Sequence, residues 1–222
     1  MARRTNSKIV KRHLILCEGR DAEEFLITYL NSEALSDNPS FANDLQVMDF
    51  GGNSELPVFL ANVMNMENYD KVESILIIRD AEKDVTRAQN DIISALTECN
   101  LSAPHLPYEW KNTSPKVGYL LFPTCNQSTQ VGTLEDLCLA ILAEVNREDI
   151  IKDIQQFMNE IGEKHNRAYP HEFKTKLHTY FSVTDAYVSL KIGEAAKAGA
   201  FDWNSEKLMP LKNFLLQVVA SQ

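Results

Sequence analysis

Short apolar runs and segments of helical periodicity alternate along the first hundred residues of the chain. The apolar runs at residues 13–17, 47–50 and 72–78 have the length of β-strands. In the segments that follow them, apolar side chains recur every three or four positions, as Phe25 and Tyr29 do. This spacing is that of an amphipathic helix. The pattern predicts three consecutive strand–turn–helix units.

Turn and capping residues mark the boundaries of the first two units. Glu18-Gly19 ends the first apolar run, and Gly51-Gly52 ends the second. Asp21 is expected to be the N-cap of the first helix. Because the strands are almost continuously apolar, they are expected to be covered on both faces, which is typical of a parallel sheet. We therefore predict an α/β fold with a mostly parallel sheet flanked by helices.

The hydrophobic pattern changes after residue 100. A loop rich in proline and polar residues precedes a fourth strand, GYLLFPTC, which ends at Pro123. The rest of the chain predicts helices separated by loops. We predict an α/β core over residues 1–125 and a mainly helical C-terminal extension over residues 126–222 that packs on it.

The composition narrows the class of protein. Of the 222 residues, 44% are hydrophobic and 24% are charged, as in an ordinary globular domain. The net charge of −9 argues against a protein that binds nucleic acid with its whole surface, but it leaves room for a local basic groove. The four cysteines form no CxxC pair, so neither a zinc ribbon nor a thioredoxin-type motif is indicated. The apolar run after the basic N-terminus is too short for a signal peptide or a membrane span. We expect a cytoplasmic protein without a membrane partner.

Acidic residues follow the strands at one predicted edge of the sheet. The third apolar run leads directly into RDAEKD, with Asp80, Glu82 and Asp84, and Glu18 ends the first run. Ligand sites of parallel α/β sheets lie at the carboxyl ends of the strands. Carboxylate oxygens are ligands of hard cations such as Mg²⁺ and Mn²⁺, which also bind substrate phosphate. The pattern therefore indicates a metal site.

Three interpretations of these acids stay open. If residues 80–84 are extended, Asp80, Glu82 and Asp84 point to one side. If Asp84 caps the next helix, Asp80 and Glu82 alone share the metal. In the third interpretation there is no metal, the acids serve the following helix, and water screens their repulsion.

The glycine turns offer a second kind of contact. Backbone N–H groups at a helix N-terminus bind phosphate. Gly19, Gly51 and Gly52 are candidates for such contacts because each precedes a predicted helix. A plain turn without a ligand is the alternative interpretation of these glycines.

These motifs resemble those of the Toprim domain, found in topoisomerases, DnaG-type primases and small nucleases. An apolar strand ending in Glu-Gly, LILCEGRDAEEF, is followed about sixty residues later by an apolar strand ending in Asp-x-acid, ILIIRDAEKD. The segments DFGGNSEL and LLFPTCNQSTQVGTLEDL resemble small Toprim-like proteins of unassigned function related to the overcoming-lysogenization-defect nucleases. The resemblance implies a Toprim-like, Rossmann-like sheet.

The resemblance assigns roles to the acids at the sheet edge. Glu18 matches the Toprim glutamate, which acts as general acid/base or as a metal ligand. Asp80 matches the first metal-binding aspartate, and Asp84 matches a third acid of some members. Glu82 stands where the family usually has aspartate, so its reach is one methylene longer.

The resemblance also adds residues outside these motifs. Glu135 resembles an additional acid of the nuclease branch. The lysine of that branch corresponds to Lys174 or Lys176. Glu23 is a candidate for a second glutamate near the first motif, with an ordinary helix position as the alternative.

The function that the resemblance implies is Mg²⁺-dependent hydrolysis of phosphodiester bonds in DNA or RNA, with Mn²⁺ as a substitute metal. The chain has no P-loop motif, so it is not expected to be a P-loop ATPase itself. An ATPase or another protein is a further expected partner. The competing hypothesis is a catalytically inactive Toprim-like scaffold that binds a nucleotide or a protein. The acidic net charge and the glutamate at position 82 favour this alternative.

Overall fold

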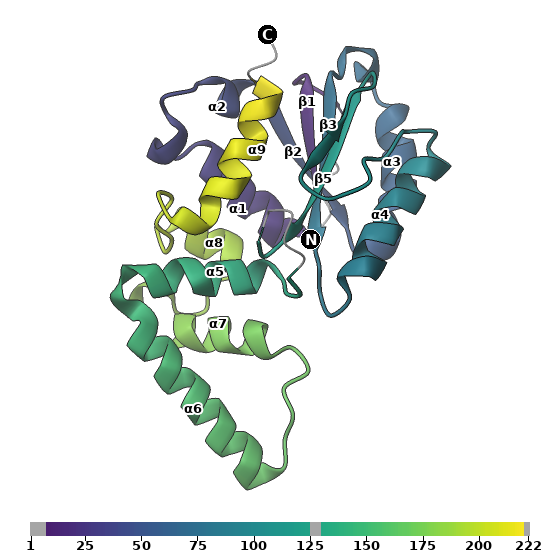
Figure 1. Ribbon diagram of the computed structural model, residues 1–222. Coiled ribbons are helices and arrows are strands. Elements are labelled where there is room, and N and C mark those ends of the chain that lie inside the picture. The colour runs from purple at the N-terminus through teal and green to yellow at the C-terminus, as the bar shows by residue number, and fades with distance from the viewer. Residues whose placement is uncertain (1–7, 125–129, 220–222) are drawn as a thin grey trace.

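Strands from both halves of the chain form one sheet in the computed structural model, which describes residues 8–124 and 130–219 (Figure 1). In this part of the chain the strands are β1 (His13–Glu18), β2 (Leu45–Gly51), β3 (Ser74–Asp80), β4 (Glu109–Lys111) and β5 (Lys116–Phe122). Their order is β2-β1-β3-β5-β4, and β4 is antiparallel to β5 while the other pairs are parallel. The predicted α/β fold with a mostly parallel sheet is confirmed.

Helices cover both faces of the sheet (Figure 1). The described α-helices are α1 (Arg20–Leu30), α2 (Ser40–Asp44), α3 (Leu56–Met64), α4 (Val85–Glu98), α5 (Leu134–Leu142), α6 (Glu148–His165), α7 (Glu172–Ser182), α8 (Ile192–Lys197) and α9 (Met209–Val219). Short 3-10 turns lie at Glu33–Leu35, Asn53–Glu55, Tyr69–Lys71, Asp185–Tyr187 and Glu206–Leu208, and a π-turn at Ala143–Arg147 joins α5 to α6. Within the described ranges, none of these helices is both long enough and apolar enough to cross a bilayer.

The alternation of side chains along the strands divides the core into two halves. Ile15 and Cys17 of β1 pack in the half that α1, α5 and α9 cover. Leu14 and Leu16 of the same strand pack in the other half, under α3 and α4. Because successive side chains of a strand point to opposite faces, a strand covered on both sides must be apolar at every position. The continuous apolar runs in the sequence have this cause.

The connections place a topological switch point between β1 and β3. The chain leaves β1 through α1, on one face, and pairs β2 with one side of β1. It leaves β2 through α3, on the other face, and pairs β3 with the opposite side of β1. In such sheets the ligand site lies outside the carboxyl ends of the strands at the switch point. Here these are the ends of β1 and β3.

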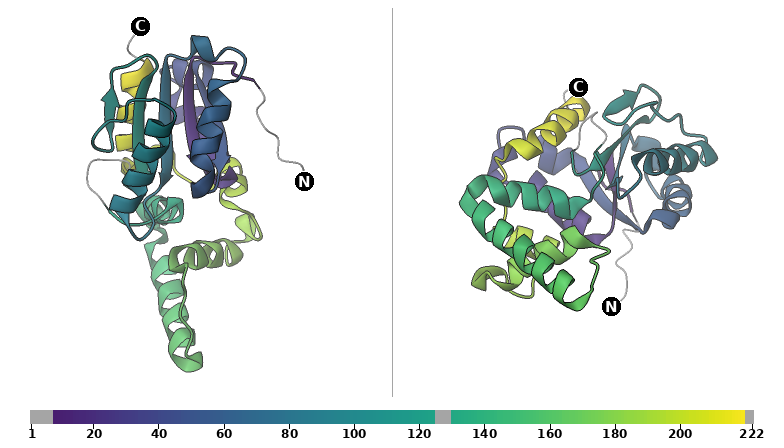
Figure 2. Two further views of the ribbon diagram at one scale, coloured as in Figure 1. Left: turned by 90° about the vertical axis from the view of Figure 1, so that its right-hand side faces the viewer. Right: turned by 60° about the horizontal axis from the view of Figure 1, so that its bottom comes forward.

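The C-terminal helices share the core of the sheet. Leu137 of α5 and Leu211 and Phe214 of α9 belong to the same buried cluster as Ile15 of β1. Helix α6 projects away from the layers, and α7 returns from its far end to pack beneath α5 (Figures 1 and 2). These two helices and their connection are called the α6–α7 hairpin. The predicted boundary at residue 125 lies outside the described residues, so the division into core and extension stays a prediction.

Two local expectations from the sequence are wrong. The helix α1 begins at Arg20, and Gly19, with φ 85°, takes the N-cap position that was expected for Asp21. Only one residue separates β1 from α1, so the helix starts before Asp21 can cap it. The Asp21 carboxylate instead accepts a hydrogen bond from the Gly193 amide, at 3.2 Å. The expected loop before β5 also contains the short strand β4, whose Trp110 packs directly on Gly118.

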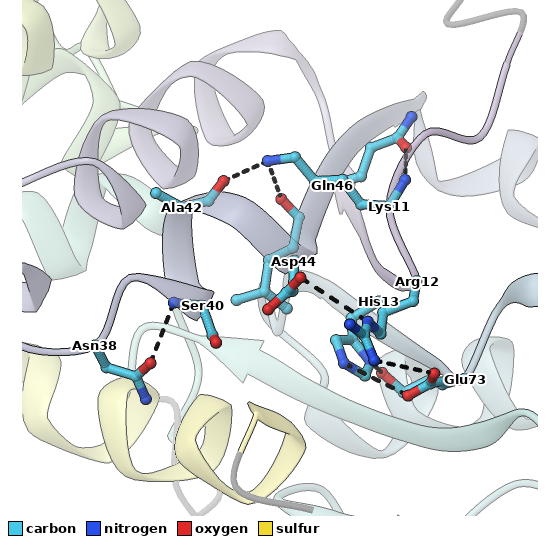
Figure 3. A network of polar contacts seen from close by, with 11 residues as sticks. Lys11, Arg12, His13, Asn38, Ser40, Ala42, Asp44, Gln46 and Glu73 are labelled. Carbon is cyan, nitrogen blue, oxygen red and sulfur yellow. Dashed lines mark hydrogen bonds and ion pairs between the residues drawn. The ribbon is translucent and has the colours of Figure 1, made fainter. Parts of the chain in front are cut away.

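A network of polar contacts ties the amino ends of the strands together (Figure 3). Arg12 pairs with Glu73 at 3.4 Å and with Asp44 at 3.9 Å. The buried His13 ring places Nδ1 3.0 Å from the Ser74 hydroxyl. Burial lowers the pKa of His13, and the charge of Glu73 opposes this shift. At this edge of the sheet the acidic side chains thus have cationic partners.

Candidate functional site

The carboxyl ends of β1 and β3 bring Glu18 and Arg79 together. The two strands are parallel, and Cys17 lies opposite Ile78, so Glu18 and Arg79 both come directly after the last paired residues. The Glu18 Oε2 atom lies 3.5 Å from the Arg79 Nε atom. Burial raises the pKa of the Glu18 carboxyl, and the charge of Arg79 opposes the rise. The predicted catalytic glutamate is therefore partly buried and paired with a buried arginine.

Arg79 is a functional candidate that the sequence did not single out. Its side chain is buried, with a relative exposure of 2%, and its Nη1 atom lies 3.4 Å from Asp91 Oδ2 of α4. Within the described residues, neither Arg79 Nε nor Glu18 Oε2 has a hydrogen-bond partner. Buried charges are rare unless they are paired. The signal in the sequence was an arginine in a strand otherwise apolar from Ile75 to Ile78.

Asp80 is enclosed by other carboxylates at the end of β3. Its Oδ1 atom accepts a hydrogen bond of 2.9 Å from the amide of Leu134, the first residue of α5. Burial and the charges of Glu135 and Glu18 raise the pKa of Asp80 to about 8. The charge of Glu135, an expected additional acid, thus acts on the Asp80 carboxyl together with the charge of Glu18. Glu18 and Glu135 are more than a hundred residues apart in the sequence.

The backbone after Asp80 excludes one of the three interpretations left open for the acids. Glu82 has a left-handed conformation, with φ 52°. It forms an antiparallel bridge with Gly132, with N–H···O distances of 2.7 and 2.8 Å. Asp84 then caps α4, because its Oδ1 accepts a hydrogen bond from the Arg87 amide at 2.9 Å. The extended arrangement is wrong, and Asp84 serves the helix N-terminus.

These acids line a cleft of about 820 Å³. The lining includes Asp80, Glu82, Asp84 and Glu135 on the side of the sheet and α5. Residues 169–174, between α6 and the first turn of α7, line it from the hairpin.

Other predicted site residues divide between the cleft and its surroundings. Lys174 is among the described residues that line the cleft, whereas Lys176, Glu18 and Glu23 are not. The Lys176 ammonium lies 5.6 Å from the centre of the Phe173 ring.

The glycine turns are bound by an acid that the sequence did not indicate. The Asp49 Oδ1 atom accepts hydrogen bonds from the Gly19 amide at 3.0 Å and the Gly51 amide at 2.6 Å. A phosphate at these two amides would have to displace this carboxylate. Burial and the charge of Asp49 raise the pKa of Glu23. Glu23 therefore lies near Asp49 and the glycine turns. Asp49 sits in the strand VMDFGG, where one acid in an apolar run was the available signal.

The described residues contain no group of three or more His, Cys, Asp or Glu side chains that is arranged to hold a metal ion. The donor chemistry nevertheless fits a hard cation, because the carboxylates of Asp80, Glu82 and Glu135 line one cleft and the charges of Glu135 and Glu82 help to raise the pKa of Asp80. Mg²⁺ is commonly held by one or two protein carboxylates together with waters and substrate phosphate. A set of three protein ligands is therefore not required.

Comparison with known protein families shows which family the chain belongs to. The model of the family described as "Protein of unknown function (DUF3226)" matches residues 12–220. The chain belongs to the DUF3226 family. The match spans all the candidate site residues, from Glu18 to Lys176. Neither the curated proteins nor the solved structures gave a match.

Proposed function

We propose that this DUF3226 protein is Toprim-like and hydrolyses phosphodiester bonds of nucleic acid with the help of a divalent cation. The observation that carries the proposal is the convergence of acids at the switch point. Glu18 of β1 and Glu135 of α5 lie close enough to Asp80 of β3 for their charges to raise its pKa, and Asp80 stands at the carboxyl ends of the strands, where sheets of this kind bind ligands.

The electrostatics of Asp80 support a cation. A carboxyl whose pKa is about 8 through burial and neighbouring acids lacks a counter-charge of its own. Two unit charges 4 Å apart repel by about 1 to 4 kcal/mol, depending on the effective dielectric, and a bound divalent ion reverses this cost. Asp80 and Glu82, with Glu135 beside them, would hold the ion. When bound, Mg²⁺ or Mn²⁺ neutralises phosphate charge and lowers the pKa of a bound water.

The other side chains supply proton transfer and positioning. Glu18 has a raised pKa, and a carboxylate with a pKa closer to neutrality is a better general base. Arg79 fixes its orientation through the ion pair. Lys83, Arg87 and Lys174 line the cleft and can compensate part of the charge of a phosphate chain.

A specific observation favours a second candidate, a scaffold without catalysis. The Glu18 carboxylate is paired with Arg79 and is not among the described residues that line the cleft. Asp49 occupies the Gly19 and Gly51 amides. In this alternative the cleft binds a nucleotide or a protein segment and performs no chemistry.

Calorimetric titration with Mg²⁺ and Mn²⁺, with and without an oligonucleotide, tests the proposal. The variant is Asp80→Asn, which removes the charge but retains the acceptor for the Leu134 amide. Asp44→Asn at the opposite edge of the sheet is the matched control. We expect metal binding to be lost in Asp80→Asn and retained in Asp44→Asn, with cleavage lost in parallel. Metal binding without cleavage of any DNA or RNA would favour the scaffold, and no metal binding by the wild type in either condition would refute the proposal.

A further inference from the structure

The wall of the cleft that the α6–α7 hairpin supplies has a different chemistry from the acidic wall. Residues 169–174 read YPHEFK, and they bring two aromatic rings, a histidine and a lysine to the lining. Glu172 is directed to α6, where it accepts a hydrogen bond of 2.8 Å from Gln155. The aromatic and cationic side chains thus characterise this wall.

The two aromatic rings differ in their surroundings. Tyr169 packs against the core cluster, and its ring lies against Gly162 of α6, where an added Cβ would be 3.7 Å from Tyr169 Cε2. Phe173 has a relative exposure of 44%, although it is a large apolar side chain. Its ring is in contact with the Lys176 ammonium. Phe173 is therefore the ring that a ligand in the cleft can cover.

The charge of the lining restricts what enters. Among the described residues, seven Asp and Glu side chains line the cleft, against four Arg and Lys. This excess of acidic side chains repels a phosphate group that enters without a cation. An anionic ligand therefore needs a cation that bridges it to the acids. A ligand that satisfies both walls has a phosphate at one end and a flat aromatic group at the other.

We infer that the cleft binds an unpaired nucleotide of single-stranded nucleic acid, with its phosphate toward Asp80 and its base stacked on Phe173. This inference rests on the proposed function, since the cation at the acids is what admits the phosphate. Every base has a face that stacks on an aromatic ring, which makes such contacts tolerant of sequence. A base within a duplex has both faces covered by its neighbours and is not available. The volume of about 820 Å³ lies in the range of ligand-binding cavities.

The chain offers a matched control for the stacking contact. Phe157 of α6 is exposed to a similar extent, 54%, but does not line the cleft. Both phenylalanines are solvent-accessible, so replacement of either by alanine should be tolerated by the fold. Phe173→Trp retains an aromatic face at the cleft and tests whether the ring itself is what matters.

Fluorescence anisotropy of labelled oligonucleotides in Mg²⁺ tests the inference, with the integrity of the probe checked on a gel. The probes are a single-stranded DNA, an RNA of the same sequence and the corresponding DNA duplex. We expect Phe173→Ala to weaken single-strand binding about tenfold or more, in line with the contribution of one stacked base. Phe157→Ala should stay within about twofold of the wild type and Phe173→Trp should retain binding. Duplex binding should be weaker and insensitive to Phe173→Ala.

The outcomes separate this inference from the proposed function. If the wild type binds single strands only with Mg²⁺, but Phe173→Ala behaves like Phe157→Ala, the stacking site is refuted and the metal site stands. Equal affinity for duplex and single strand also refutes it. If no probe binds with or without Mg²⁺, the proposed function fails and the inference fails with it.

Discussion

The two edges of the sheet differ in the partners of their acidic side chains. At the amino ends of the strands, Arg12 pairs with Asp44 and Glu73, so the acids there have cationic partners. At the carboxyl ends, Asp80 lies among other carboxylates, and its pKa is raised to about 8. Both edges are formed by the ends of the same strands, so the strands themselves do not explain why the acids are paired at one edge and crowded at the other.

This difference separates a structural polar network from a candidate site. Paired charges at a surface edge contribute little and cost little. Crowded, partly buried acids oppose folding unless a ligand compensates them, and such strongly perturbed groups are typical of functional sites. The amino edge therefore carries a structural polar network, whereas the carboxyl edge is the candidate for ligand binding.

The first prediction concerns Asp80→Asn in the absence of metal. Its pKa rises from 3.8 to about 8 on folding, so the carboxyl favours the folded state less and less as the pH rises from about 4 to 8. Asp80→Asn removes this loss and should stabilise the protein at pH 8 by up to about 5 kcal/mol, at roughly 1.4 kcal/mol per pKa unit. Urea unfolding of both proteins at pH 4 and pH 8 with a chelator checks it. Equal stabilities at pH 8 would contradict it, whereas added Mg²⁺ should narrow the gap by stabilising the wild type.

Arg79→Met should destabilise the protein by about 3–5 kcal/mol, because it removes a buried cation and leaves the partly buried Glu18 without its partner. Arg12→Met at the other edge, where the side chain is 43% exposed, should cost less than about 1 kcal/mol. Denaturant unfolding at pH 7 measures both. Adding Glu18→Gln to Arg79→Met should recover part of the loss, and similar losses for Arg79→Met and Arg12→Met would remove the distinction between the two edges.

Asp49→Ala should destabilise the protein by about 1–3 kcal/mol, since the Gly19 and Gly51 amides lose their shared acceptor. Asp49→Asn retains an oxygen acceptor and should lose clearly less stability than Asp49→Ala. Thermal unfolding of the two variants side by side decides the matter. Equal losses would mean that the charge of Asp49, and not its hydrogen bonds, holds the turns.

The smallest effect is expected at His13, with the opposite pH dependence. Burial lowers the pKa of His13 below 6.5, so the folded state favours the neutral ring. Its contribution to stability is present above pH 6.5 and is lost as the pH falls below this value. His13→Gln should reduce the loss of stability below pH 6.5. It should not change the loss of stability that Asp80 causes as the pH rises toward 8. Unfolding curves of the variant between pH 5 and pH 8 check this, and an unchanged slope below pH 6.5 would contradict it.

Several features of the fold and the site were accessible from the sequence because they depend on local order. The continuous apolar runs predicted strands covered on both sides, and the structure confirms them. Parallel strands end at the same edge, so Glu18 and Asp80 were correctly expected to lie at one edge of the sheet, and the structure adds that their strands are neighbours. Cys17 is buried within its strand, as its apolar surroundings suggest. Each of these features follows from the hydrophobic periodicity of a single segment or from the position of a residue within it.

Other features were decided only by the tertiary structure, because they join segments far apart in the chain. Asp80 accepts its hydrogen bond from Leu134, 54 positions away, and Asp49 binds an amide 30 positions away, that of Gly19. The side chain of Arg79 has one acid partner on β1 and another on α4. The hairpin that carries Phe173 reaches the acids only when α5 to α7 are packed. Periodicity reports which face of an element is buried, whereas the partner across a cleft depends on how the elements pack in three dimensions.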